Sequence, residues 1–408
     1  MKNFIKLLII FMLPPFFSFI YFLKKFYRIP KKNSLFLAIS TGSIFLLMIP
    51  MYDAIYFYNS YVFLRTLPIK YFLTIEKNIY HCLYYFFSFF IEYWHIYSII
   101  VIFILYIWNK TFVEIIDKKN RFYGHFFIIF IFCLYPREVL DLTRYFLASV
   151  LYLYFIVKFY KTKERKYFLL MFLLFFIHHS FIIFILLFYI STFLKKINLK
   201  SFYFLNIIFF LSFIKILEKS ILKVIIIFSK NFSPTLSERI TGYMLNQKTI
   251  LGLLKESRAE TLKFTWTLFI LIIVGFLLSY LILKIYKFKS FIDYLILEIL
   301  FFNFFFIDKN ILYERVFIIF ILLTVIWLCL QTKLKKKVLI FFQFLILLNS
   351  FFFTVYYIPN FYIKGQVAHL LSVKTAQFEI YKAFYVPTFI TITKNKYTDF
   401  WIEKWRVK

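Results

Sequence analysis

The chain has 408 residues, of which 63% are hydrophobic and 25% aromatic, and its mean hydropathy is +0.81. Because a soluble globular protein is about half apolar, this composition excludes an ordinary soluble domain and indicates a membrane protein. The 50 Lys and Arg residues outnumber the 19 Asp and Glu residues and give a net charge of +31, which in a soluble protein would suggest nucleic-acid binding.

Apolar runs of about 20 residues predict membrane-spanning helices. In chain order we place them near residues 4–23, 34–52, 94–110, 122–135, 139–158, 167–179, 180–194, 201–217, 264–284, 290–307, 311–332 and 338–357. The first run is too long for a signal-peptide core and lacks a cleavage site of small residues, so we expect it to be retained as a span. The runs 122–135 and 167–179 are short, which leaves roughly 10 to 13 spans open. The predicted fold is therefore all-α: a polytopic transmembrane helix bundle forming one membrane domain over residues 1–357.

The basic residues predict the orientation of these spans. Six short loops hold 24 of the 50 Lys and Arg residues, and they are 24–33, 109–122, 158–166, 195–200, 284–289 and 333–337. Cytoplasmic loops retain Lys and Arg, so these alternate loops are predicted inside and both termini outside. The long loops 52–93 and 218–263 and the extramembranous tail 358–408 then lie outside, and the basic residues do not indicate nucleic acid.

Charges in or at the ends of membrane helices are costly, so each is a functional candidate. Arg137, Asp141 and Arg144 precede or begin the fifth predicted helix at spacings of four and three residues. A salt-bridged helix start would explain them without a ligand. Binding of an anion by the arginines is the alternative.

Two further groups stand at predicted outer helix ends. His178 and His179 are adjacent and would point about 100° apart on a helix, so a single site is expected to use only one of them. Arg315 lies in the first turn of a predicted span, where the helix dipole disfavours a cation. It should therefore have an anionic partner, which could be Glu314, Asp308 or a ligand.

Three more carboxylates are functional candidates with less support from the sequence. Asp53 and Glu76 belong to the first outer loop, where a carboxylate can simply be solvated. Glu298 lies near the middle of the tenth predicted helix, and we expect it to pair with an arginine or a histidine inside the bundle.

Several of these residues belong to segments that resemble the EpsG-type and Wzy-type polymerases of O-antigen, capsule and exopolysaccharide. The segment 53–61, an aspartate followed by spaced tyrosines, resembles a family motif, and Glu76 stands where the family has a downstream glutamate. Residues 143–148 resemble its Arg-Gln-x-x-Ala helix start, although Tyr145 replaces the glutamine. Residues 176–180 resemble its Phe-His-x-Ser element, and residues 313–317 its late arginine.

The resemblance implies a site that transfers a glycan from undecaprenyl diphosphate to a new lipid-linked repeat unit at the outer face of the bacterial cytoplasmic membrane. It implies that Arg144, Arg315 and Arg137 bind the diphosphate, and that the general base is His178, Asp53 or Glu76. Asp141, His179, Glu314 and Glu298 would support them. The sequence contains no Asp-x-Asp pair, so we expect neither a metal nor a cofactor. Chain-length regulator and flippase proteins are the expected protein partners.

Three alternatives stay open at this stage. A flippase for lipid-linked oligosaccharide would also need cationic groups, but in a cavity reachable from both sides, often between related halves of the chain. Another polyprenyl-phosphate-dependent glycosyltransferase or an O-antigen ligase would share an outer-face site. An outer-leaflet acyltransferase is a lower-ranked enzyme.

Overall fold

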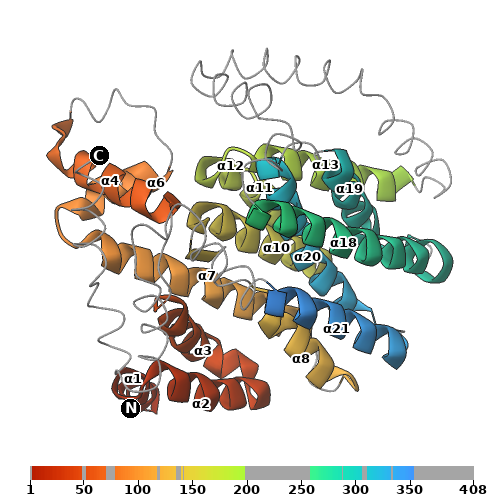
Figure 1. The fold of residues 1–408 in the computed structure, drawn as a ribbon, viewed down its shortest axis with the longest axis horizontal. Helices are drawn as coiled ribbons and strands as arrows, with labels where there is room; N and C mark the ends of the chain where they lie inside the picture. Colours follow the sequence, from red (N-terminus) through yellow and green to blue (C-terminus); the bar gives the residue numbers. More distant parts are fainter. Residues whose placement is uncertain are drawn as a thin grey trace. The chain divides into compact units, whose positions relative to one another are not determined.

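The computed structural model describes residues 2–47, 52–69, 79–116, 120–134, 139–140, 142–197, 258–286, 288–305, 310–331 and 334–352. Within these ranges every regular element is a helix and no strand is present, which confirms the all-α class (Figure 1). The predicted span 201–217, most of the outer loop 218–263 and the tail 358–408 lie outside the described residues. The predicted single domain divides into two compact units, residues 1–182 with 346–408, and residues 183–345.

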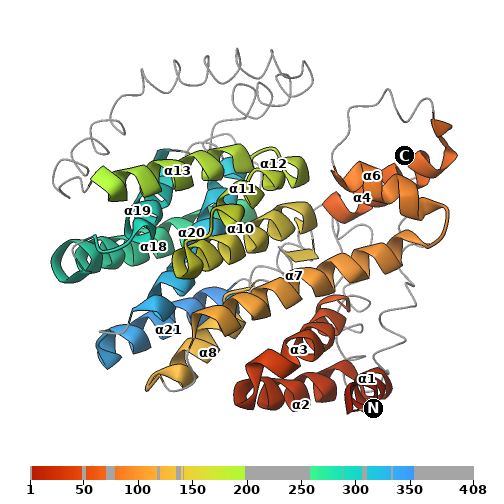
Figure 2. The same cartoon turned by 180° about the vertical axis from the view of Figure 1, so that it is seen from behind.

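The helices of the first unit are α1 (Lys2–Met12), α2 (Pro15–Arg28), α3 (Pro30–Phe45), α4 (Tyr52–Thr66), α6 (Ile79–Ser88), α7 (Tyr93–Ile115), α8 (Tyr123–Phe132), α10 (Thr143–Thr162), α11 (Arg165–Leu170) and α12 (Leu173–Ile177). The second unit holds most of α13 (Phe181–Ile197), then α18 (Arg258–Tyr280), the π-helix η1 (Leu281–Tyr286), α19 (Phe291–Phe305), α20 (Asn310–Leu330) and the first part of α21 (Lys336–Phe351). In the first unit α3 packs against both α2 and α7, as Figure 2 shows from behind.

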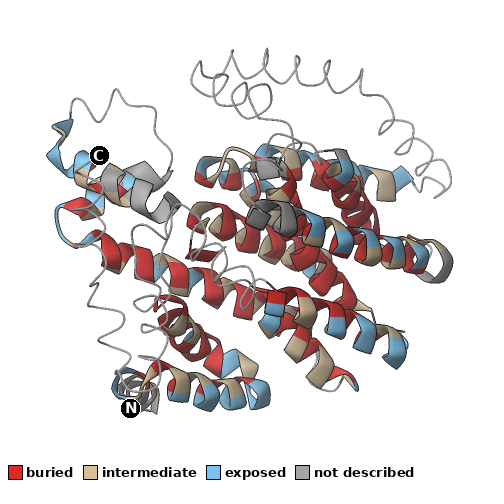
Figure 3. Cartoon of the chain, in the orientation of Figure 1, coloured by how far each residue is buried: buried red, intermediate tan, exposed pale blue. Residues whose placement is uncertain are grey.

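Three described helices are long and apolar enough to cross a membrane: Tyr93–Ile115, Thr265–Leu283 and Tyr313–Leu330. They coincide with the predicted spans 94–110, 264–284 and 311–332. The second of them, α18, exposes large apolar side chains at spacings of three and four residues along one face (Figure 3), namely Phe269, Ile272, Phe276 and Tyr280. A continuous apolar stripe of this kind requires an apolar partner or lipid, which supports a membrane protein.

The predicted first span, 4–23, is wrong because the chain is broken there into α1 and α2. Pro14 precedes the break and Pro15 is the first residue of α2, where a missing N–H costs the helix nothing. The Lys6 ammonium donates a hydrogen bond to Asn33 Oδ1 at 3.1 Å. Lys6 therefore lies beside the 24–33 turn, whereas a single span from 4 to 23 would place it at the opposite end.

The predicted span 167–179 is also interrupted. It consists of α11 and α12, two short helices of six and five residues. The preceding helix, α10, ends at Lys163 in a left-handed conformation with φ of 58°. The region thus contains a turn and two short helices, and neither helix has the length of a span.

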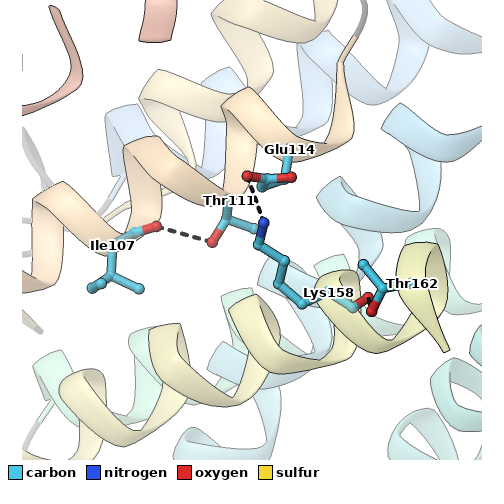
Figure 4. Close-up of polar contacts among 5 residues, drawn as sticks. All are labelled: Ile107, Thr111, Glu114, Lys158 and Thr162. Carbon is cyan, nitrogen blue, oxygen red and sulfur yellow. Dashed lines mark hydrogen bonds and ion pairs between the residues drawn. The ribbon is translucent and has the colours of Figure 1, made fainter. Parts of the chain in front are cut away.

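Helices α7 and α10 lie side by side and run in the same direction. Near their N-terminal ends the Tyr97 hydroxyl donates to the Leu140 carbonyl oxygen at 2.8 Å. At their C-terminal ends Lys158 Nζ forms an ion pair with Glu114 Oε1 at 2.8 Å (Figure 4). These two contacts are separated by about 25 Å of α7, so they fix the parallel register over most of the helix.

The three basic turns of the first unit gather at one end. The Asn109 side chain donates to the carbonyl oxygen of Ser34 at 3.0 Å, and the Tyr123 hydroxyl donates to the carbonyl oxygen of Tyr27 at 3.0 Å. Together with the pair of Glu114 and Lys158, these bonds bring the turns 24–33, 109–122 and 158–166 together. This is the arrangement that the alternation of basic loops predicts.

The second unit repeats this pattern with its own turns. Lys195 Nζ donates to the Phe288 carbonyl oxygen at 3.3 Å, which brings the C-terminal end of α13 to the residues just before α19. Trp327 Nε1 donates to Asp293 Oδ1 at 2.7 Å, which brings the end of α20, before the turn 333–337, to the start of α19. Arg315 lies on the same helix, about 18 Å from Trp327 along the axis of α20 and so toward the opposite end of the helix.

This arrangement predicts which cysteines a membrane-impermeant maleimide can reach. Cys82 is exposed on α6, near the N-terminal end of α7, whereas Cys133 and Cys329 are buried. We expect Cys82 to react in vesicles of one orientation. In a Cys82→Ser background, a cysteine at the exposed position of Lys161 should react only in vesicles of the opposite orientation. Labelling of both positions from the same side would contradict the predicted topology.

Candidate functional site

The candidate site in the first unit is centred on the N-terminal end of α10, away from the basic turns. Arg144 is the second residue of this helix, and in the described part of the chain Leu142, at the N-cap, offers no side-chain hydrogen bond to the helix. The first backbone N–H groups of a helix carry partial positive charge and have no partner within the helix. Arg144 is half-buried, and its Nε atom is fully buried. Backbone and side chain thus present positive charge at the same helix end, which suits an anion.

Tyr84 reaches this position from α6. Its side chain is 1% exposed, and it shares a side-chain hydrogen bond with Tyr93. Burial raises the pKa of Tyr84 above its ordinary value, while the nearby positive charge of Arg144 acts in the opposite direction. The phenol therefore stays protonated at neutral pH, within the electrostatic reach of the guanidinium.

Tyr84 belongs to a cluster of packed tyrosine rings from α4, α6 and α7. The rings of Tyr61, Tyr84 and Tyr93 have their centroids 5.5 to 5.8 Å apart, and Tyr97 stands 5.9 Å from Tyr93. The Tyr61 hydroxyl donates to the Ile91 carbonyl oxygen. The aspartate-tyrosine motif of residues 53–61 and the aromatic amphipathic stretch 80–93 mark this part of the chain in the sequence, but neither predicts that these tyrosines pack together. The regular recurrence of tyrosine on α4, α6 and α7 is the signal that could have found it.

His178 joins the site from the end of α12, a helix that packs against both α6 and α10. Its Nδ1 lies 2.8 Å from Ser180 Oγ, and its ring meets the Tyr145 ring edge to face at a centroid distance of 5.4 Å. These contacts fix the orientation of the imidazole. Because Ser180 engages Nδ1, proton exchange with a ligand would use Nε2.

The adjacent His179 takes a different position. Its ring contacts the Phe175 ring at a centroid distance of 5.0 Å. That one site uses only one of the two histidines stays a prediction. His178, which meets a residue of α10, is the member that lies at the candidate site.

The other predicted site residues fall into three groups. Arg315 and Glu314 are half-buried on α20 and belong to the second unit. Asp53 lies on α4, and nothing is described of its side chain. The remainder lie outside the described residues, and they are Glu76, Arg137, Asp141 and Asp308. The structure therefore brings Arg144 and His178 into one unit and leaves the proposed salt bridge of Arg144 with Asp141 untested.

The hydrogen-bond partner of Glu298 differs from the predicted one. Instead of an arginine or a histidine, its hydrogen-bond partner among the described residues is the hydroxyl of Ser191, at 2.7 Å from Glu298 Oε2. Within the same ranges, no three His, Cys, Asp or Glu side chains group as metal ligands. The groups assembled at the candidate site are a guanidinium, phenols, an imidazole and a helix N-terminus.

No protein-family model, curated protein sequence or solved structure matches this chain.

The tyrosine cluster predicts a loss of stability at alkaline pH. Burial raises the pKa of Tyr61 from 10.0 to about 12, with Arg65 opposing and Glu92 adding to the rise. Since the pKa is higher in the folded state, the stabilisation is complete below pH 10.0 and is lost as the pH rises through about 12. We expect Tyr61→Phe to show a smaller fall in melting temperature over this interval than the wild type.

The matched control is Tyr280→Phe, at a tyrosine that is 48% exposed. It should leave the alkaline fall unchanged. An equal fall in the wild type and in Tyr61→Phe would show that Tyr61 does not contribute to it.

Proposed function

We propose that the protein polymerises lipid-linked oligosaccharide repeat units into a surface polysaccharide. The observation that carries this proposal is the placement of Arg144, Tyr84 and His178 around the N-terminus of α10, at the end of the first unit opposite its basic turns. A guanidinium at a helix N-terminus, with an imidazole at the end of a helix that packs against it, suits a reaction that releases a diphosphate. The family resemblance of residues 143–148 and 176–180 supports the same reaction.

In the proposed reaction a hydroxyl of the incoming repeat unit attacks the anomeric carbon of the growing glycan. A new C–O bond forms, and the bond between the anomeric carbon and the diphosphate oxygen breaks. Undecaprenyl diphosphate leaves with the bonding electron pair, and the hydroxyl proton passes to His178 Nε2. Arg144, the Tyr84 hydroxyl and the first N–H groups of α10 would stabilise the charge that develops on the diphosphate.

Arg315, in the second unit, and Arg137, outside the described residues, are diphosphate-binding residues only in what the family resemblance implies. Arginine suits this role better than lysine because its planar guanidinium can bind two phosphate oxygens at once. The gathering of basic turns at one end of each unit supports an inner location for those ends. The candidate site then faces the outer leaflet of the cytoplasmic membrane, where such substrates are presented.

We expect Arg144→Ala to lower polymer formation roughly 100-fold or more, the usual effect of removing a donor that stabilises a developing anion. Arg144→Lys should restore little of it, because an ammonium cannot make the bidentate contact. The assay is purified protein in vesicles with lipid-linked repeat units and no energy source, with products resolved by length on a gel.

The matched control is Arg165→Ala, which removes an exposed arginine from a basic turn. It should give the wild-type ladder. A normal ladder from Arg144→Ala would refute the proposed role of Arg144. Failure of the wild-type protein to elongate glycans, combined with movement of the lipid-linked unit between leaflets, would favour the flippase alternative.

The two histidines provide an internal comparison for the general base. His178→Gln should lower the rate of elongation by two orders of magnitude or so, within the range typical of general base catalysis. His179→Gln should retain most of it, since His179 lies apart from the Tyr145 contact. Equal losses in the two variants would remove His178 from the proposed role.

A further inference from the structure

Glu298 and Ser191 form an isolated polar pair inside the second unit. Glu298 is 5% exposed and Ser191 is fully buried. The residues next to Glu298 on α19, from Leu295 to Leu300, are buried apolar side chains. Ionised carboxylates are rarely tolerated in such surroundings without a cation or several hydrogen-bond donors.

Ser191 makes two hydrogen bonds, and they show which residue must supply each hydrogen. Its Oγ lies 2.8 Å from the Leu187 carbonyl oxygen and 2.7 Å from Glu298 Oε2. Both distances are those of full O–H···O hydrogen bonds, but a serine hydroxyl has only one hydrogen to donate. A carbonyl oxygen has none. If Ser191 donates to Leu187, the proton of the second bond must belong to Glu298.

The second oxygen of the carboxyl group leads to the same conclusion. Glu298 Oε1 is buried and has no hydrogen-bond partner in the described part of the chain. An ionised Glu298 would thus have at most one donor, the hydroxyl of Ser191, for its two oxygens. A neutral acid needs only to donate from Oε2 and to leave a carbonyl oxygen, which is much less costly to bury than a charge.

Asp293, on the same helix, shows the opposite pattern. Its Oδ1 accepts from Trp327 Nε1 at 2.7 Å, and its Oδ2 accepts from the backbone N–H and the hydroxyl of Ser290 at 2.7 and 3.1 Å. Three donors surround this carboxyl group, which is what an ionised group requires. Two buried carboxyl groups five positions apart are therefore surrounded in opposite ways.

Charged and titratable side chains also belong to the elements around Glu298. Those described are Tyr189, Lys195 and Lys196 on α13, Tyr280 on α18, Asp293 and Tyr294 on α19, and Tyr313, Glu314, Arg315 and Cys329 on α20. None of them is a hydrogen-bond or ion-pair partner of Glu298 within the described ranges. Lys195, the nearest cation along α13, donates to Phe288 instead.

We infer that Glu298 carries a proton and donates it to Ser191 Oγ, so that the two residues form a proton-binding site inside the apolar core of the second unit. This site is independent of the proposed glycan transfer, because neither residue belongs to the site around Arg144. It also explains why Glu298 has no cationic partner among the described residues: a neutral carboxyl group requires none.

Infrared spectroscopy of the full-length protein in vesicles tests this inference. The difference spectrum of wild type minus Glu298→Gln should contain the C=O stretching band of a protonated carboxylic acid. The matched spectrum of wild type minus Asp293→Asn should contain the paired bands of a carboxylate. Carboxylate bands in the Glu298→Gln difference spectrum would overturn the proposal.

The stability of the variants gives a second, independent readout. Glutamine at position 298 can donate an N–H to Ser191 Oγ as the acid does, so Glu298→Gln should keep the wild-type melting temperature. Asp293→Asn replaces an acceptor of three hydrogen bonds with a group that also donates, and it should melt at a lower temperature. A failure of Glu298→Gln to fold would contradict the inference, since a neutral donor would then be unable to replace the side chain.

Discussion

A polar group that is buried in an apolar helix bundle must find its partner within the protein, and this constraint orders the described helices. A charge left without a partner there costs several kcal/mol or more. The buried bond from the Tyr97 hydroxyl to the Leu140 carbonyl oxygen meets the constraint at one end of α7 and α10, and the partly exposed ion pair of Glu114 and Lys158 joins the two helices at the other end. The parallel register of these helices, and with it the side on which Arg144 lies, follows from contacts that satisfy polar groups.

The candidate site uses the same constraint in a different way. A cation at the N-terminus of a helix is disfavoured by the helix dipole, and Arg144 occupies that position. Tyr84 beside it supplies a donor and no negative charge at neutral pH, because burial raises its pKa. In the proposed function, this end of α10 is where the diphosphate of the substrate is bound.

The sequence predicted the apolar elements well where length and composition determine them. The spans 94–110, 264–284 and 311–332 correspond to helices of sufficient length, and the alternation of basic loops matches the gathering of turns in each unit. The span 4–23 was wrong because a hydropathy average does not register that Pro14 and Pro15 interrupt a helix.

The candidate site was predictable only in part. Arg144 and His178 stood out because charged and titratable residues are rare in apolar segments. Tyr84 did not, since it is one of 33 tyrosines in the chain and its sequence context is as aromatic as the rest. Glu298 was predicted to pair with an arginine or a histidine, whereas its hydrogen-bond partner among the described residues is Ser191; nothing in the sequence around Glu298 indicates a serine on α13.

The basic turns have a consequence for the lipids around the protein. Each Lys or Arg near an anionic membrane surface contributes about 1 kcal/mol of attraction at short range. The turns 24–33, 109–122 and 158–166 lie at one end of the first unit and concentrate this attraction over a small area. Anionic lipids should therefore be enriched in the annulus around that end, anchoring the first unit at a fixed depth in the bilayer.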